Sequence, residues 1–343
     1  MIKIIFRFSI FFLLSYLILS MATPFTKFLN SRSIKHQINY INDIMVDGED
    51  DRLQQRFPEG KLFSNAIFTL SILEFCENND CSKEHYSRIV DKNIKRIISD
   101  STLNSFNEYI SPPYGMFYNG WANYVMKKYK RSELFKLSSI KELITEQSAM
   151  IEQRIVNRQK DSIRILDSYA GVDWPADNII GLISIDDVII QKKWLDTLLN
   201  TSESETRLIH HSGSHKGIIR GSSQSLIVFC LSEIGYDKID EYNIKFKQTF
   251  VDDYLGVQLV RENEDGTSQT DFDSGPVIFG YGASATIMNI KTQANLNDKN
   301  AKRTWALMNT ISFPITFFGR KYYLFKQEPM FDIFMLWASV ELK

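Results

Sequence analysis

The chain has 343 residues, with 40 Lys and Arg against 41 Asp and Glu, and 44% of its residues are hydrophobic. A nearly neutral chain without basic runs argues against nucleic acid as a partner. Its three cysteines are too few for a disulfide scaffold. Beyond the amino-terminal segment, no stretch is long and apolar enough to cross a bilayer.

The amino-terminal segment has the composition of a secretory signal. Lys3 and Arg7 precede an apolar run from Phe8 to Leu19, and small residues surround Ala22. This pattern predicts cleavage after Ala22 and export to the periplasm or the extracellular space. The alternative is an uncleaved membrane anchor at residues 1–22, which would be the chain's only membrane contact. Residues 23–343 are then expected to form one domain.

Helical periodicity dominates the rest of the chain. Helices are expected over residues 62–77, 82–98, 116–130, 138–159, 177–190, 192–199, 222–234, 239–253, 277–296, 299–311 and 330–342. Consecutive helices are expected to form pairs. Strands are expected only over residues 256–262 and 315–325, where each could form a hairpin between two helix pairs.

A proline or glycine precedes the first helix of each pair, and these residues recur at intervals of about 50 residues. These positions are Pro58, Pro113, Pro175, Gly221, Pro276 and Pro329. Six helical hairpins that cannot bury their apolar stripes alone are best satisfied by stacking side by side and closing. The predicted fold is therefore all-α, an (α/α)6 toroid with short β-hairpin insertions at the rim. An open solenoid is the competing arrangement.

In such a toroid the first helices of all pairs run parallel, so their amino-terminal ends meet at one rim. Loops placed by a rigid scaffold are where binding and catalysis concentrate. Asp177 falls in a first helical turn and could act as a base, and Asp173 could act as an acid if Trp174 desolvates it. Asp273 precedes the fifth pair in the same way. A pair of carboxylates suits general acid/base chemistry, but helix capping explains both Asp177 and Asp273 equally well.

Aromatic and polar residues cluster near the same helix starts. Tyr114 could donate a proton, and aromatic rings could stack on a sugar or enclose an isoprenoid chain. The candidate substrate-binding residues are Trp174, Tyr118, Tyr169, Asn178, Arg220 and Tyr281. Trp121 is expected in the core. Tyr281, between Gly280 and Gly282, is expected inside a helix where the glycines permit close packing.

Three histidines, His210, His211 and His215, precede Arg220. Their spacing matches no established metal-ligand pattern, so a linker or a lid over the rim is expected, with neither a metal nor a cofactor. Ser222 and Ser223 are interpreted as helix-start residues because no nucleophile elbow surrounds them. Cys76 and Cys81 could form a disulfide or could both be buried thiols.

The middle two thirds of the chain resembles the linalool dehydratase/isomerase-like family of the α/α toroid superfamily. The likeness is visible in the sequence from Tyr118 to Tyr124, in the Asp177-Asn178 pair, in residues 245–254 followed by Arg261-Glu262, and in the glycine-rich residues 275–285. The resemblance implies the toroid fold and a shared cavity. In the linalool enzymes cysteines flank the Asp-Asn pair and a histidine follows the tyrosine motif, whereas Trp174, Ile183 and Trp121 stand at those places here. The resemblance therefore speaks against dehydration of linalool itself.

Together these patterns lead us to expect an exported, cofactor-free enzyme of lyase, isomerase or glycosidase type. Its rim carboxylates and tyrosines would act on a hydroxylated small molecule, either a terpenoid-like alcohol or a sugar. The alternative is a toroid without catalytic activity that binds a glycan or a protein partner.

Overall fold

The computed structural model describes residues 30–201, 208–212, 218–270, 275–325 and 328–342. The described chain is mostly helical, as the sequence predicts, and its strands form short antiparallel pairs. The predicted signal, residues 1–22, lies outside the described residues.

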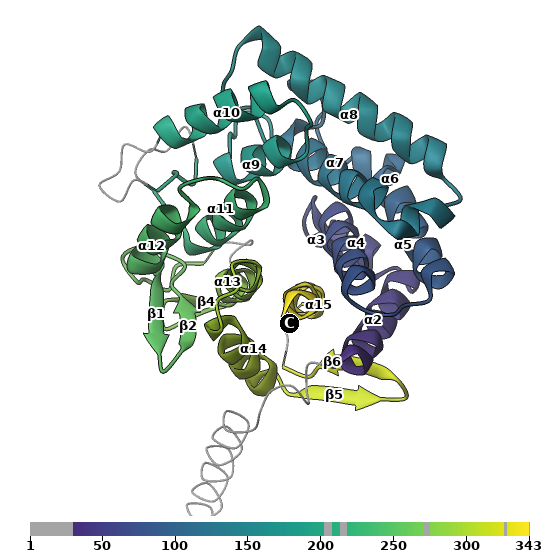
Figure 1. Cartoon of the computed structure of the whole chain (residues 1–343), viewed down its shortest axis with the longest axis vertical. Coiled ribbons are helices and arrows are strands. Elements are labelled where there is room, and N and C mark those ends of the chain that lie inside the picture. The colour runs from purple at the N-terminus through teal and green to yellow at the C-terminus, as the bar shows by residue number, and fades with distance from the viewer. Residues whose placement is uncertain (1–29, 202–207, 213–217, 271–274, 326–327, 343) are drawn as a thin grey trace, which may run out of the picture.

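Six helices surround the middle of the molecule (Figure 1). They are α4 (Gly60–Asn78), α7 (Gly115–Arg131), α9 (Pro175–Ile183), α11 (Gly221–Glu233), α13 (Ala283–Asn295) and α15 (Met330–Glu341). Each packs on the next, and α15 packs on α4 as well as on α13, so the contacts run in a closed circuit. These helices are buried on most faces because they are covered both by the outer layer and by one another.

A second layer of helices covers the first (Figure 1). These helices are α2 (Ser31–Val46), α5 (Lys83–Ile97), α8 (Lys141–Asp161), α10 (Val188–Asn200), α12 (Ile239–Phe250) and α14 (Asn300–Ile311), with the short helices α3 (Glu49–Arg56), α6 (Asp100–Leu103) and the 3-10 helix η2 (Glu133–Leu137) between them. Each long outer helix packs on one inner helix. The outer helix α5, for example, buries Tyr86, Ile89, Val90, Ile94 and Ile97 along one stripe and exposes polar residues elsewhere.

Three β-hairpins interrupt the helical pattern. They are β1 (Val251–Tyr254) with β2 (Val257–Val260), β3 (Val277–Ile278) with β4 (Tyr281–Gly282), and β5 (Pro314–Phe317) with β6 (Arg320–Tyr323). The strands predicted at 256–262 and 315–325 fall in the first and third hairpins. Each hairpin closes through two residues with positive φ, which are Leu255-Gly256, Phe279-Gly280 and Phe318-Gly319.

Three sequence predictions are corrected by these boundaries. The helix expected over 239–253 ends at Phe250, because the β-branched Val251 begins the strand β1 that pairs with β2. The helix expected over 277–296 begins only at Ala283, so Gly280 and Tyr281 lie in a hairpin and not in a helix, because Phe279 and Gly280 adopt left-handed turn conformations. The helix expected over 177–190 ends at Ile183. The next helix begins at Val188 because the Asp187 side chain accepts a hydrogen bond from the Ile190 amide over 3.0 Å and caps it.

Side chains fill the space between the inner helices. Trp337 packs edge-on against Trp121 and Phe229, at ring-centroid separations of 6.4 and 5.3 Å, and all three are almost completely buried. Phe63 continues this group towards the start of α4 by packing on Trp121. Trp121 is therefore a core residue, as predicted, and the ring has a solid middle.

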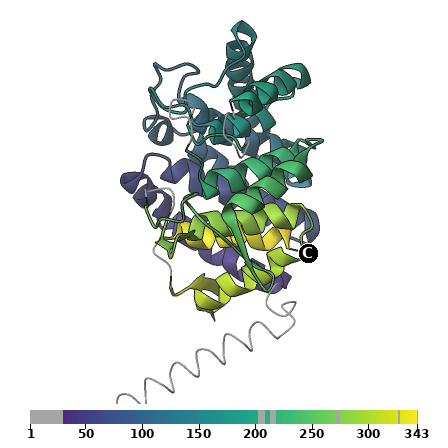
Figure 2. The ribbon, with the colours of Figure 1, turned by 90° about the vertical axis from the view of Figure 1, so that its left-hand side faces the viewer.

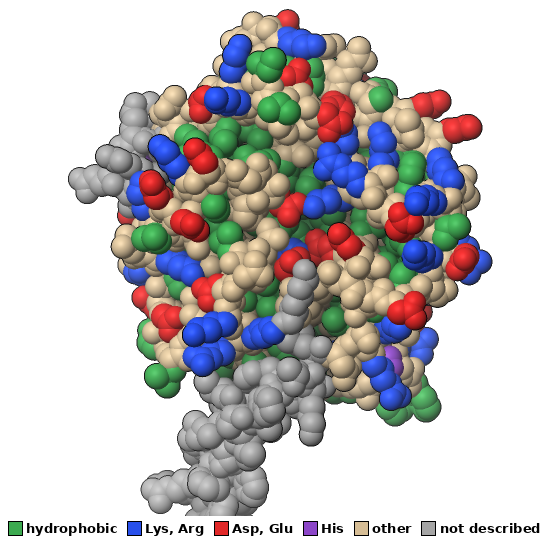
Figure 3. All heavy atoms as spheres, viewed as in Figure 1, with side chains coloured by type: hydrophobic (Ala, Val, Ile, Leu, Met, Phe, Trp, Pro, Cys, Tyr) green, Lys and Arg blue, Asp and Glu red, His purple; other side chains and the backbone are tan. Residues whose placement is uncertain are grey.

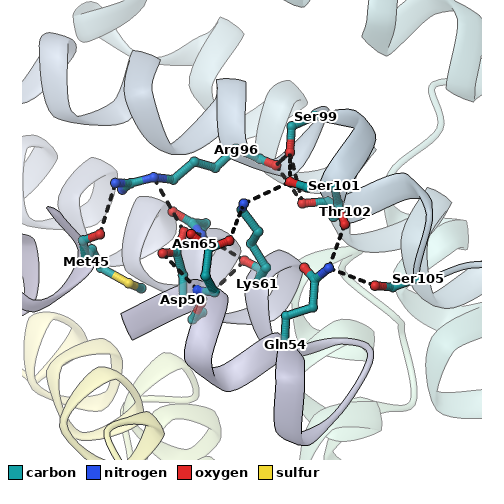
Figure 4. A network of polar contacts seen from close by, with 12 residues as sticks. Met45, Asp50, Gln54, Lys61, Asn65, Arg96, Ser99, Ser101, Thr102 and Ser105 are labelled. Atoms are coloured by element: carbon teal, nitrogen blue, oxygen red, sulfur yellow. Dashed lines mark hydrogen bonds and ion pairs between the residues drawn. The ribbon is translucent and has the colours of Figure 1, made fainter. Parts of the chain in front are cut away.

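A buried polar network holds α3 and α6 against the start of α4 (Figure 4). Asp50, which is 1% exposed, accepts a hydrogen bond from Asn65 over 3.0 Å and lies 3.4 Å from Arg96. Lys61 donates to Asp51 and to Ser101 over 2.7 and 2.9 Å. These bonds fix the chain leading into the first inner helix.

Cys76 and Cys81 form a disulfide at the end of α4, and Cys230 is a buried free thiol in α11. A disulfide of this kind persists in oxidising compartments, which is consistent with export. None of the described helices combines the length and the apolar character needed to span a bilayer.

Candidate functional site at one end of the helix ring

Direct contacts join the starts of the inner helices. Arg56, before α4, pairs with Glu328, before α15. Glu59, at the start of α4, accepts a hydrogen bond from the hydroxyl of Tyr169, which lies before α9. These starts therefore lie at the same end of the ring. The opposite end, where α15 finishes, faces the viewer in Figure 1 and lies at the right of Figure 2.

A second set of contacts brings in the remaining helices. The amide of Met116 at the start of α7 donates over 2.9 Å to the backbone carbonyl of Asp167, which lies in the segment that leads to α9. At the start of α11, the Gly221 amide donates to the backbone carbonyl of Glu262 over 2.9 Å. Glu262 also lies against Gly282, where α13 begins. Loops far apart in the sequence are thus gathered at one rim.

A chain of partly exposed rings runs along this rim. Phe63 and Phe117 pack edge to face at 5.6 Å, and Phe117 lies 6.0 Å from Tyr169. Tyr169 packs on Trp174 at 5.3 Å, and Trp174 stacks on His211 at 5.8 Å. Partly exposed aromatic surfaces of this kind bind the apolar faces of sugars or isoprenoid chains.

Glu262 is a fully buried carboxylate at the rim, with 0% exposure. Its Oε1 accepts hydrogen bonds from Arg220 Nε over 3.0 Å and from the Ser222 hydroxyl over 2.7 Å, and it forms an ion pair with Arg220 Nη2 at 3.0 Å. Arg220 itself is 8% exposed. A buried charge is tolerated only with partners of this quality, so the pair is a fixed electrostatic element beside the aromatic surface.

Two glycines make room for this pair. A Cβ at Gly221 would meet the Arg261 carbonyl oxygen at 2.0 Å, and a Cβ at Gly282 would meet the Glu262 Oε2 at 2.8 Å. Both distances are below any ordinary contact. The glycines therefore allow the starts of α11 and α13 to approach the segment after β2 that carries Glu262.

His211 lies between the ion pair and the aromatic surface. Its Nδ1 is 3.0 Å from the Ser223 hydroxyl, and its Nε2 is 3.4 Å from an Arg220 nitrogen. A guanidinium group can only donate hydrogen bonds, so Nε2 is the acceptor and Nδ1 carries the proton towards Ser223. His211 in this state cannot take a proton from Ser223, which excludes a serine–histidine nucleophile in this arrangement.

The predicted aspartates flank Trp174. Asp173 is half-buried and accepts a hydrogen bond from Ser212 over 3.4 Å. Asp177 is 5% exposed in the first turn of α9, where the helix dipole favours a negative charge. Asn178 uses its whole amide group on backbone partners, accepting from the Leu166 amide and donating to the Leu166 and Trp174 carbonyls. Its observed role is to hold the preceding loop.

Tyr114 and Tyr118 lie farther towards the outer layer. The Tyr114 ring packs on Tyr118 at 5.7 Å, and the Arg154 guanidinium of α8 lies 5.6 Å from its centre. Tyr114 has a φ of 72°, which turns the chain into Gly115. Tyr118 is 2% exposed, and burial raises the pKa of its hydroxyl.

Tyr281 and Asp273 complete the predicted set. The Tyr281 hydroxyl donates to the Asp252 carboxylate over 2.9 Å and lies 2.8 Å from the Tyr254 hydroxyl, so it joins the first two hairpins. These bonds raise the pKa of Tyr281, with the Tyr254 hydrogen bond the largest cause. Asp273 lies outside the described residues, as does His215.

The sequence did not single out Glu59 or Glu262 as site residues, and Ser223 was assigned only to a helix start. Glu262 falls in a segment that was interpreted as a strand, and burial of a single charge leaves no sequence signal. His211 was expected in a linker or lid, and it contributes a ring to the aromatic surface. The described residues include no cluster of three or more groups suited to a metal ion.

The opposite end of the ring carries a different buried charge group. Lys291 pairs with Glu74 and, over 2.8 Å, with Glu341. Burial raises the pKa of Glu74, whereas for Lys291 the two carboxylates outweigh burial and raise its pKa. A surface hollow of about 260 Å³ nearby is lined by residues that include Tyr124, Lys128 and Glu233.

No protein-family model and no curated protein matches this chain.

Proposed function

We propose that this protein is an exported (α/α)6 toroid whose aromatic rim binds a hydroxylated small molecule and performs acid/base chemistry on it without a cofactor. The toroid assignment draws on the closed circuit of helix contacts and on the resemblance to the linalool dehydratase/isomerase-like family. The single observation that carries the functional proposal is the buried Arg220–Glu262 pair, with His211 joining it to Trp174.

The arrangement suits a hydroxylated substrate for a physical reason. The ring faces of Tyr169, Trp174 and His211 supply apolar contact, whereas Asp173 and Asp177 can accept hydrogen bonds from hydroxyl groups. Asp177 is proposed as the base, because a carboxylate in a first helical turn is stabilised in its charged form. The filled middle of the ring would confine the substrate to the rim.

The second candidate function is binding of a glycan or a protein partner without catalysis. The observation that favours it is Asn178, whose amide is fully used in holding a loop, as a scaffold residue would be. Under this proposal Asp177 would likewise serve only the helix start.

A ligand screen separates the two functions. Purified protein would be screened by thermal shift against sugars and isoprenoid alcohols, and each stabilising compound would be followed by NMR for conversion. Trp174→Ala should abolish stabilisation in either case. Asp177→Asn should retain binding and lose conversion if the protein is an enzyme, with exposed Asp161→Asn as the control. A ligand that is bound and never converted would support the binding function. If every stabilising compound also stabilised Trp174→Ala, or if no compound stabilised the wild-type protein, both proposed functions would be refuted.

A further inference from the structure

All three hairpins present large apolar side chains at their tips, and Phe279, between β3 and β4, is 91% exposed. Two of these tips, those of the first and third hairpins, share one edge of the molecule. Leu255, in the turn between β1 and β2, is 90% exposed, and Phe318, between β5 and β6, is 81% exposed. Phe317 beside it is 63% exposed. Both tips lie along the lower edge of the molecule in Figure 1, one at each side of α14.

The turn geometry does not explain these residues. Leu255 and Phe318 have φ angles of 57° and 45°, and each is followed by a glycine with positive φ. Two-residue turns of this kind favour Asn-Gly or Asp-Gly, because a bulky side chain is strained in the left-handed region. Placing leucine and phenylalanine there costs both conformational energy and solubility, which indicates that the exposed side chains meet an apolar environment.

The edge between the two tips is basic. From residue 299 to 326 the sequence contains no acidic residue, and the exposed or partly exposed cations there are Lys299, Lys302, Arg303 and Arg320. Lys321 is buried, and Asp252 and Asp253 lie beside these cations in β1. Lys299 and Arg303 are exposed on α14, and Arg303 donates to the Leu255 carbonyl over 3.1 Å. Arg320 pairs with Asp43 of α2, so part of the charge is balanced locally. Hydrophobic side chains project at both lower corners of Figure 3, with basic ones beside them.

The first described helix packs against this same edge. The helix α2 begins at Ser31 and packs along β6, where Asn39 donates to Gly319 at the tip of the third hairpin. In the sequence, α2 follows the apolar run from Phe8 to Leu19.

We propose that this hairpin edge, formed by the β1–β2 turn, α14 and the β5–β6 hairpin, docks on a membrane surface that contains anionic phospholipid. Leu255, Phe317 and Phe318 enter the headgroup boundary, and the cations of α14 face the phosphates. A nucleic acid also attracts basic residues, but aliphatic and phenylalanine tips without hydrogen-bonding groups suit lipid better. Docking here leaves the aromatic rim accessible from the side.

The test places an environment-sensitive fluorophore on single cysteines of the full-length chain, at Leu255→Cys and at Phe318→Cys. The matched control is Val188→Cys, an aliphatic residue that is 70% exposed on α10, the helix at the upper side of Figure 1. Wild-type protein treated with the same fluorophore measures any background labelling of the native cysteines. Cys230 is buried, and Cys76 and Cys81 form a disulfide. Vesicles are made of phosphatidylcholine, with or without phosphatidylglycerol, and include phospholipids brominated on the acyl chain.

In vesicles with phosphatidylglycerol, the labels at 255 and 318 should be quenched by the brominated lipid and the label at 188 should not. The triple variant Lys299→Gln, Lys302→Gln, Arg303→Gln should weaken this quenching by roughly 100-fold in apparent affinity, about fivefold per cation, and high salt should do the same. Lys192→Gln with Lys193→Gln on α10 is the charge control.

Three results would overturn the proposal. The first is quenching at 255 and 318 that does not exceed that at 188 although the protein floats with the vesicles. The second is equal quenching with and without phosphatidylglycerol. The third is a spectral change produced by single-stranded oligonucleotide or by higher protein concentration alone.

Discussion

The indole nitrogen of Trp337 donates a hydrogen bond to the Glu74 carboxylate over 3.2 Å, and this contact joins the aromatic filling of the ring to the buried Lys291 group. Lys291 is 1% exposed between two carboxylates. Removing it leaves two partly buried carboxylates, Glu74 and Glu341, without their shared cation.

Lys291→Met should therefore lower the free energy of unfolding by about 3–5 kcal/mol. Urea denaturation followed by circular dichroism measures this change. Lys192→Met, at an exposed site on α10, is the control and should be nearly neutral. An unfolding midpoint for Lys291→Met equal to that of the control would show that the pair contributes nothing.

Lys321 should make stability rise with pH. Burial lowers its pKa from 10.5 to about 8, although the Asp332 carboxylate opposes this shift. Between these two values the unfolded chain binds more protons than the folded one, so the free energy of unfolding increases with pH, by about 3 kcal/mol in total.

Lys321→Met should be more stable than wild type near neutral pH and should lose this component of the pH dependence. Denaturation curves for both proteins between about pH 7 and pH 10 give the comparison. Parallel dependences in the two proteins would show that another group is responsible.

Gly115 and Gly171 form a matched pair for testing the rim backbone. Both have positive φ, of 73° and 74°, so alanine costs about 1–2 kcal/mol at either site. At Gly115 the new Cβ would also meet the Ser168 carbonyl oxygen at 2.0 Å, whereas nothing lies within 4 Å at Gly171. Gly115→Ala should be less stable than Gly171→Ala by about 1–3 kcal/mol. Equal melting temperatures of the two variants would mean that the loop at Ser168 moves to accommodate the new Cβ without a cost in stability.

Glu262→Gln keeps an oxygen that can accept from Arg220 and Ser222 but removes the charge that offsets the guanidinium. It should destabilise the protein by about 2 kcal/mol and weaken binding of any rim ligand. Glu264→Gln, at an exposed position two residues on, is the control. Thermal melts with and without a ligand from the screen provide the measurement, and matching behaviour of the two variants would remove Glu262 from the site.

The sequence predicted the elements that periodicity controls. The helix expected over 116–130 is Gly115–Arg131, and that expected over 330–342 is Met330–Glu341. The start of α13 was wrong because Pro276 looks like a helix start, whereas the β-branched Val277 and Ile278 and the turn at Phe279 form a hairpin first. The helices α2 and α3 were not predicted, although Asn30 caps α2 by accepting from the Ser33 amide over 2.7 Å.

Less of the candidate site could be predicted, because burial and long-range pairing decide it. Trp174 and Tyr169 were expected near helix starts and do lie together on the rim. The partnership of Arg220 with Glu262 joins residues 42 apart in sequence, and only tertiary structure could select that carboxylate among the others. The fate of Asn178 likewise depends on a loop 12 residues upstream.

The packing of α15 against both α4 and α13 has a consequence for how the protein is made. The first inner helix finds one of its two neighbours only after the last one has been synthesised, so its apolar flank stays uncovered throughout translation. Deleting residues 330–341 would leave two such flanks exposed, and the shortened chain should bind chaperones and aggregate instead of forming a smaller stable domain.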